Sequence, residues 1–178
     1  MAQHLEDGFE DFESQISKEI LEMHTADQEL RERLLDTPWT DADIYAWAGL
    51  HARNNDRLRA IIVEIGWPTK SRVGMDASNA AWLIAQHADN DVEFQKHCLE
   101  HMGKEPESEV SHQHIAFLYD RICINENRPQ YFGTQFTTDE NGAHIPMPIE
   151  DQDNVDARRV AIGMDTIAEY SRHLDNIS

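Results

Sequence analysis

Apolar residues recur at every third or fourth position along most of this chain, and this spacing constrains the fold more than any other feature. In the first long stretch, residues 9–35, they form one stripe, as a helix with a single buried face requires. The same spacing predicts further helices at residues 40–66, 76–87, 92–102, 111–124, 154–162 and 165–174. The chain is therefore expected to be mainly α.

One segment near the C-terminal third departs from the helical spacing. Residues 129–136 are aromatic and contain threonine, residues 139–142 form a turn signal, and residues 144–149 alternate with prolines. This pattern predicts a β-hairpin whose second arm is an edge strand. With 178 residues and 40% hydrophobic content, we expect one helical-bundle domain over residues 1–178, with residues 1–8 as a flexible N-terminus.

The charge balance limits the classes of partner. Acidic residues outnumber basic ones by 34 to 15, so the formal net charge is -19. Such a chain repels phosphate backbones and anionic membranes, and we expect neither a nucleic-acid nor a membrane partner. We expect the cytoplasm, because no apolar run is long enough for a membrane span and the N-terminus lacks a signal-peptide pattern. Cys98 and Cys123 are expected to be reduced core thiols.

Polar residues that interrupt the buried stripes are candidate functional positions, because a buried polar group needs a bonding partner. Asp27 falls on the stripe of the first helix, and Arg31 lies one turn further on. Either the two form a local ion pair at the edge of the core, or the carboxylate faces a pocket. His51 and Asn55 interrupt the second stripe in the same way, and we interpret His51 as a structural histidine.

The segment Gln86–Asp91 follows a run of small apolar residues, 77–85, that suits a helix buried on most sides. This helix would deliver Gln86 and His87 to a corner rich in carboxylates. Asp91 has the position of an N-cap for the next helix. His87 is the candidate for proton transfer, because an imidazole changes its charge near neutral pH.

Beyond these patterns, the chain resembles the bacterial domain-of-unknown-function family 6624. The matching stretches lie between about residues 20 and 170, and they are Met23-x3-Asp27-Gln28-x2-Arg31, Gly66-Trp67-Pro68, Val73-Gly74, Ala80-Ala81-Trp82-Leu83, Gln86-His87-Ala88-Asp89 with Phe94-Gln95, Asp120-Arg121, Pro129-Gln130 with Gly133-Thr134-Gln135, and Pro148-Ile149-Glu150-Asp151 leading to Arg159. The resemblance implies a shared fold and site but no established activity. The family's tyrosine before Gly-Thr-Gln is Phe132 here, with Tyr131 one place earlier, which on a strand would move the hydroxyl to the opposite face.

These residues suggest one cavity for a small polar, anionic metabolite. Its members would be His87, Asp89, Asp27, Arg31, Arg121, Gln130 and Gln135, and Gln28, Gln86 and Asp120 are further candidates for ligand binding. His87 would act as acid and base, Asp89 or Asp27 would orient it, and either arginine would hold the anion. A hydrolase or lyase is favoured and no cofactor is expected, because no nucleotide-cofactor fingerprint is present.

A second hypothesis is a non-catalytic binding or interaction domain, in which the same residues bond within the fold. Gln86 and His87 would cap carbonyl groups, Asp120 and Arg121 would form a salt bridge, and the glutamines would hold the hairpin. The pairs His87/Asp91 and His97/His101 have the spacing of metal ligands on a helix. Asp91 lies past the predicted helix break, and His97 and His101 lack an obvious third ligand, so no metal site is predicted. The sequence leaves the oligomeric state open.

Overall fold

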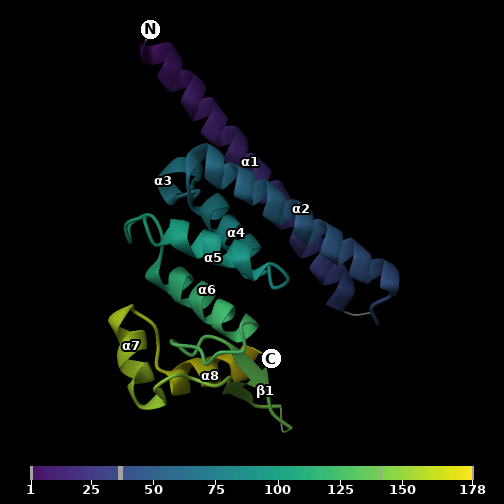
Figure 1. The fold of residues 1–178 in the computed structure, drawn as a ribbon, viewed down its shortest axis with the longest axis vertical. Helices are drawn as coiled ribbons and strands as arrows, with labels where there is room; N and C mark the ends of the chain where they lie inside the picture. The colour runs from purple at the N-terminus through teal and green to yellow at the C-terminus, as the bar shows by residue number, and fades with distance from the viewer. Residues whose placement is uncertain (1, 36–37, 141, 178) are drawn as a thin grey trace. The chain divides into compact units, whose positions relative to one another are not determined.

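The computed structural model describes residues 2–35, 38–140 and 142–177. These residues form eight α-helices, one short 3-10 helix and one antiparallel hairpin, so the predicted mainly α fold with one hairpin is confirmed (Figure 1). The elements are α1 (Ala2–Leu35), α2 (Asp41–Ile65), α3 (Lys70–Val73), α4 (Met75–Gln86), α5 (Val92–Met102), α6 (His112–Asn125), β1 (Phe136–Thr138), β2 (His144–Pro146), η1 (Gln152–Asn154), α7 (Val155–Ala161) and α8 (Ile167–Ile177). In the described ranges, no helix is long and apolar enough to cross a membrane.

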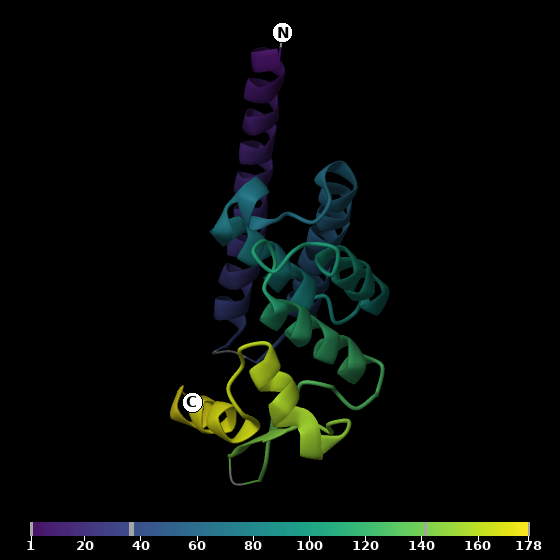
Figure 2. The same cartoon turned by 90° about the vertical axis from the view of Figure 1, so that its left-hand side faces the viewer.

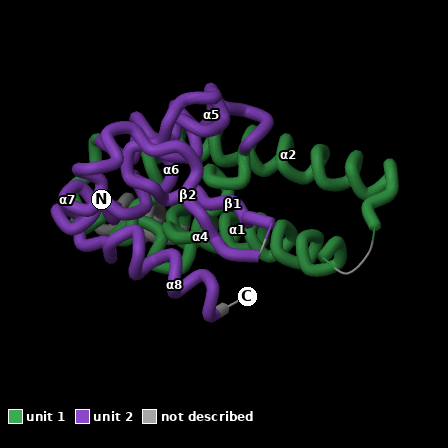
Figure 3. The backbone as a smooth tube through the Cα atoms, turned by 90° about the horizontal axis from the view of Figure 1, so that it is seen from below, with its two compact units in different colours: residues 1–88, 104–109 green, residues 89–103, 110–178 purple. Residues whose placement is uncertain are grey.

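The chain divides into two compact units, each with buried apolar residues of its own (Figure 3). Unit 1 comprises residues 1–88 and 104–109, and unit 2 comprises residues 89–103 and 110–178. The expectation of a single domain stays a prediction.

Unit 1 is built on α1, which lies alongside α2 in both views and also contacts α3 and α4 (Figures 1 and 2). Ile16 and Ile20 of the predicted stripe are buried in this unit, and so are Ala80 and Ala81 of α4. The small side chains of α4 allow its backbone to approach α1 and α2 closely. The helix α1 begins at Ala2 rather than near Phe9, so residues 2–8 of the stretch expected to be flexible form its first turns.

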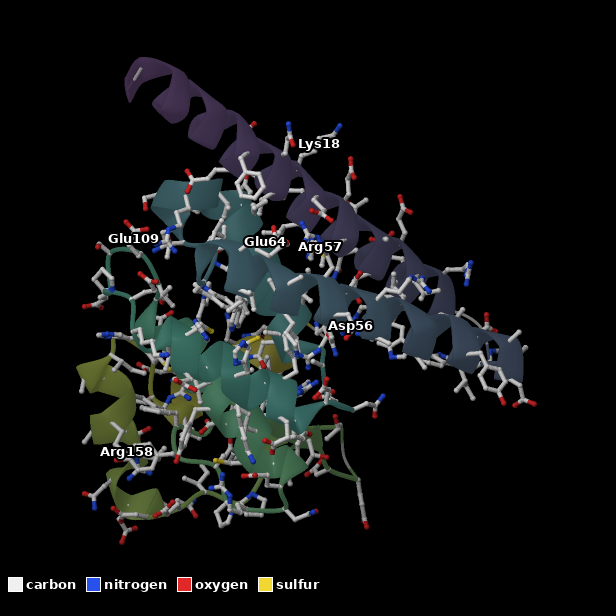
Figure 4. All side chains as sticks on the ribbon, turned by 45° about the horizontal axis from the view of Figure 1, so that its top comes forward. Lys18, Asp56, Arg57, Glu64, Glu109 and Arg158 are labelled. Atoms are coloured by element: carbon white, nitrogen blue, oxygen red, sulfur yellow. The ribbon has the colours of Figure 1, made fainter. Side chains whose placement is uncertain are left out.

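A charged pairing on the surface joins the two long helices of unit 1. Arg57 of α2 donates two hydrogen bonds to Glu19 of α1, at 2.7 and 2.8 Å. It donates a third to Glu64 at 2.8 Å, and Figure 4 labels both of these residues on α2. The bond from Arg57 is the main cause that holds the pKa of Glu19 below its ordinary value. These bonds join α1 to α2, and partly exposed pairs of this kind contribute about 1 kcal/mol or less.

The predicted helix ends are largely confirmed. The hydroxyl of Thr40 accepts a bond from the backbone N–H of Asp43, and the Asp43 carboxylate accepts one from the N–H of Thr40. Asp91 caps α5, because its carboxylate accepts the N–H of Phe94 at 3.0 Å. His87 closes α4 as its C-cap residue. The stretch 67–74, where no helix was predicted, contains the short helix α3.

Unit 2 contains α5, α6, the hairpin, α7 and α8. The hairpin is shorter than predicted, because only three residues on each side pair, with Phe136 opposite Pro146. The assignment of residues 129–135 to the first arm is wrong, since they form bends and a bridge instead of a regular strand. The argument that a strand separates the faces of Tyr131 and Phe132 therefore does not apply. Cys98 and Cys123 are buried free thiols, as expected.

Two buried charged side chains hold the turn at residues 131–134. The carboxylate of Asp120 accepts the backbone N–H groups of Tyr131, Phe132 and Thr134 at 2.7–3.1 Å. The guanidinium of Arg159 donates to the carbonyl groups of Phe132 and Gly133 at 2.9 and 3.1 Å. Burial raises the pKa of Asp120 above its ordinary value, against the opposing effect of these N–H donors. The backbone of the turn thus takes the place of a counter-ion for each charge.

The Asp120 contacts predict a specific loss of stability. In Asp120→Asn an amide NH2 must replace one oxygen, and both oxygens of Asp120 face N–H donors. We expect the free energy of unfolding to fall by about 2–3 kcal/mol, because a buried donor then has no acceptor. Urea unfolding would measure the loss, with the exposed Asp153→Asn as control. Equal stability of the two variants would contradict this account.

Candidate functional site

Asp27 is the polar centre of unit 1. It lies on the inward stripe of α1, between the buried residues Ile20 and Leu34, and only 2% of its surface is exposed. Gln28 donates to its Oδ2 at 3.2 Å from the next position in the chain. A carboxylate so deeply buried is costly unless charged or hydrogen-bonding groups surround it.

His87 supplies the strongest of these contacts. Its Nδ1 lies 2.9 Å from Oδ2 of Asp27, and its Nε2 lies 3.4 Å from Nη1 of Arg31. Since a guanidinium can only donate, Nε2 is the acceptor in the second contact, and the proton of the neutral ring is on Nδ1. The carboxylate therefore orients the imidazole so that its basic nitrogen faces the exposed Arg31.

Two more histidines surround the same carboxylate. Nε2 of His51, on α2, lies 3.3 Å from Oδ1 of Asp27, which is close enough for an ion pair without the alignment of a hydrogen bond. The His51 ring packs on Trp47 with centroids 4.2 Å apart. His24 lies one turn before Asp27 on α1 and acts on it through its charge. Three helices thus direct imidazoles to one acidic group.

The protonation of Asp27 reflects a balance between burial and these histidines. Burial is the largest single effect and raises the pKa of Asp27. The hydrogen bond from His87 and the charges of His87, His51 and His24 together outweigh it, so the net pKa lies below the ordinary value. Asp27 is consequently an anion at neutral pH, although almost none of its surface reaches water.

A second polar network lies in unit 2. Asp89 forms a bidentate pair with Arg121, with both N···O distances at 2.8 Å, and Asn125 donates to the same carboxylate at 3.0 Å. Nη1 of Arg121 also donates to Oε1 of Gln135 at 2.9 Å. Of the two carboxylates proposed as partners of His87, Asp27 is therefore the one that bonds to it, whereas Asp89 bonds to Arg121.

The remaining predicted site residues have structural contacts. Gln130 is fully buried, donates to the carbonyl groups of Gln135 and Met147, and accepts the N–H of Gln135. The carboxylate of Asp120 accepts backbone N–H groups of the turn at residues 131–134. Gln86 is buried at the end of α4. Gln130 in particular holds the hairpin, as the non-catalytic hypothesis expects.

The predicted residues thus fall into two groups. Asp27, Gln28, Arg31 and His87 meet in unit 1, and Asp89, Arg121 and Gln135 meet in unit 2. The single cavity expected for members of both groups stays a prediction. In the described part of the chain, no three His, Cys, Asp or Glu side chains are arranged to share a metal ion.

Two residues of the unit 1 cluster were missed or underrated in the sequence. His24 was not selected, although its i–3 position relative to Asp27 places both on one helix face. His51 was selected as an interruption of the second stripe, but nothing in a one-dimensional pattern pairs it with a residue 24 positions earlier. A helical wheel of α1 alone places His24 beside Asp27. No helical wheel pairs His51 of α2 with Asp27 of α1.

Comparisons with known proteins add one family and no activity. The model of a family of unknown function, DUF6624, matches residues 14–178. No curated protein matches the chain, and no solved structure matches it. The match covers both units, so the geometry described for the two polar networks falls within the family's extent.

The depressed pKa of Asp27 predicts how stability depends on pH. An acid with a lowered folded-state pKa stabilises the fold above its unfolded value, here 3.8, and this stabilisation is lost as the pH falls through the folded-state pKa. The difference in unfolding free energy between wild type and Asp27→Asn should therefore shrink as the pH falls below about 4. Urea unfolding at several pH values would measure it, with the exposed Asp76→Asn as control. A difference that stays constant down to the lowest pH would contradict the prediction.

Proposed function

The chain belongs to DUF6624, and we propose that it is an enzyme in which His87 acts as general acid and base on a small anionic metabolite. One observation carries the proposal: a buried, ionised Asp27 bonds Nδ1 of His87 and leaves Nε2 as a basic nitrogen beside Arg31. A buried carboxylate that orients a histidine is a recurring arrangement for proton transfer.

In the proposed reaction, Nε2 of His87 removes a proton from the substrate, or from a water that attacks it. The imidazolium that forms is stabilised by Asp27. The carboxylate accepts a hydrogen bond from Nδ1–H and stays ionised, and no proton moves to it. Nε2 then returns the proton to the leaving group. No covalent intermediate and no redox step is required, so a hydrolase or a lyase is the proposed reaction class, in the bacterial cytoplasm.

Arg31 would bind the anionic group of the substrate. It is exposed, and its Nη1 lies 3.4 Å from Nε2 of His87. A carboxylate or phosphate held by the guanidinium fork would bring the neighbouring atoms of the substrate to the basic nitrogen. The contact between Arg31 and His87 would open when the substrate enters.

A non-catalytic ligand-binding or interaction domain is the second candidate. The contacts of Asp27 to Gln28 and His87 lie within the described fold, as expected of a structural brace. On this account the protein has no turnover, and His87→Gln would only lower the stability of the fold.

The enzyme proposal is tested with a metabolite screen on the purified chain. We expect turnover of at least one small carboxylate or phosphate ester, and a fall in kcat of about 10²–10⁴-fold in His87→Gln and in Asp27→Asn, because proton transfer supplies a factor of that size. The exposed His173→Gln is the matched control. Full activity in folded His87→Gln would overturn the role of His87 as general acid and base. A wild-type protein that turns over none of the carboxylates and phosphate esters screened would favour the ligand-binding domain.

Arg31 gives a separate prediction for the same substrate. In Arg31→Gln we expect KM to rise about 10–100-fold with a smaller change in kcat, because the charged bond to the substrate anion is lost in both ground and transition states. Arg53→Gln, an exposed arginine on α2, should leave both constants unchanged. An unchanged KM in Arg31→Gln would remove this residue from the site and leave the role of His87 untouched.

A further inference from the structure

An apolar hollow of about 340 Å³ lies in unit 2, and no contact in the Asp27 cluster involves it. Leu99 and Gly103 contribute the end of α5, Ile115 and Tyr119 contribute one face of α6, and Tyr131 and Phe132 come from the turn that Asp120 holds. Residues from three separate segments therefore converge on one concave surface.

Three aromatic rings give the hollow its chemical character. Tyr131 and Phe132 meet edge to face with centroids 4.9 Å apart, and Tyr119 lies 6.2 and 6.5 Å from them. Each pair is nearly perpendicular, at 79–84°. Aromatic rings favour such contacts with a further ring beyond the burial of apolar area. None of the lining residues is Asp, Glu, Lys, Arg or His.

The aromatic rim is held rigidly. The buried carboxylate of Asp120 accepts the backbone N–H groups of Tyr131 and Thr134. The buried guanidinium of Arg159 donates to the carbonyl group of Phe132. The guanidinium of Arg158 lies 4.2 Å from the centroid of Tyr131 and donates to its carbonyl oxygen at 2.9 Å. A rim that is fixed before binding loses little conformational entropy when a ligand enters.

We propose that this hollow binds a small, uncharged, planar aromatic molecule of one or two rings. Its volume supports the size, since a cavity of roughly 150 Å³ accommodates benzene. The lining has no charged side chain, and the guanidinium of Arg158 beside Tyr131 already donates to three backbone carbonyl groups, so the hollow disfavours an aromatic anion. The edge-to-face rings favour an aromatic molecule over an aliphatic one of equal volume. The site is independent of the function proposed for His87.

Indole is the probe, titrated into the full-length protein and followed through amide chemical shifts. We expect saturable shifts at Leu99, Gly103, Ile115 and the turn at residues 131–134. Cyclooctanol is an aliphatic molecule of similar size, and indole-3-acetate is an anion. Each should bind at least about tenfold more weakly than indole, a difference of about 1.4 kcal/mol or more. An absence of saturable shifts in the hollow, or a tighter fit of either competitor, would overturn the proposal.

Substitutions that fill the hollow provide the matched test. Leu99→Trp should weaken indole binding about tenfold or more, because the new ring occupies the same volume. Val160→Trp adds the same ring at an exposed site of α7 in the same unit and should leave binding unchanged. Ile115→Phe serves as a second filling variant if Leu99→Trp does not fold. Unaltered indole affinity in a folded filling variant would contradict the site.

Discussion

A carboxylate removed from water must be compensated within a few ångströms, and each unit of this chain is organised around one such group. In unit 1 Asp27 is compensated by histidines from its own helix, from α2 and from the end of α4. In unit 2 Asp120 is compensated by the backbone of a turn. Both solutions bring distant segments together, so the buried charges specify which segments meet.

The two carboxylates have different consequences because their partners differ. Backbone N–H groups do not titrate, so the contacts of Asp120 fix a conformation, that of the aromatic rim of the hollow in unit 2. Histidines exchange protons near neutral pH, so Asp27 orients groups that can take part in chemistry. The chemical nature of the donor therefore separates a structural carboxylate from one that supports the proposed reaction.

The helical part of the fold could be predicted, because a helix needs only local spacing and local end signals. The stripe of α1, the capping box at Thr40 and the cap at Asp91 all depend on residues within one or two turns. The first arm of the hairpin could not, because aromatic and threonine residues favour strands in general. Here residues 131–134 are held as a turn by Asp120 and Arg159, both more than ten positions away.

For the candidate site, the sequence by itself determined that Asp27 falls on the apolar stripe of α1 and that His87 lies at the end of a helix of small apolar residues, since periodicity fixes both. Only the tertiary structure decided that these two residues bond to each other, that His51 joins them, and that Asp89 pairs with Arg121 instead. The physical reason is distance along the chain. Contacts between residues 24 to 60 positions apart depend on how helices pack against one another, and helical spacing carries no record of that packing.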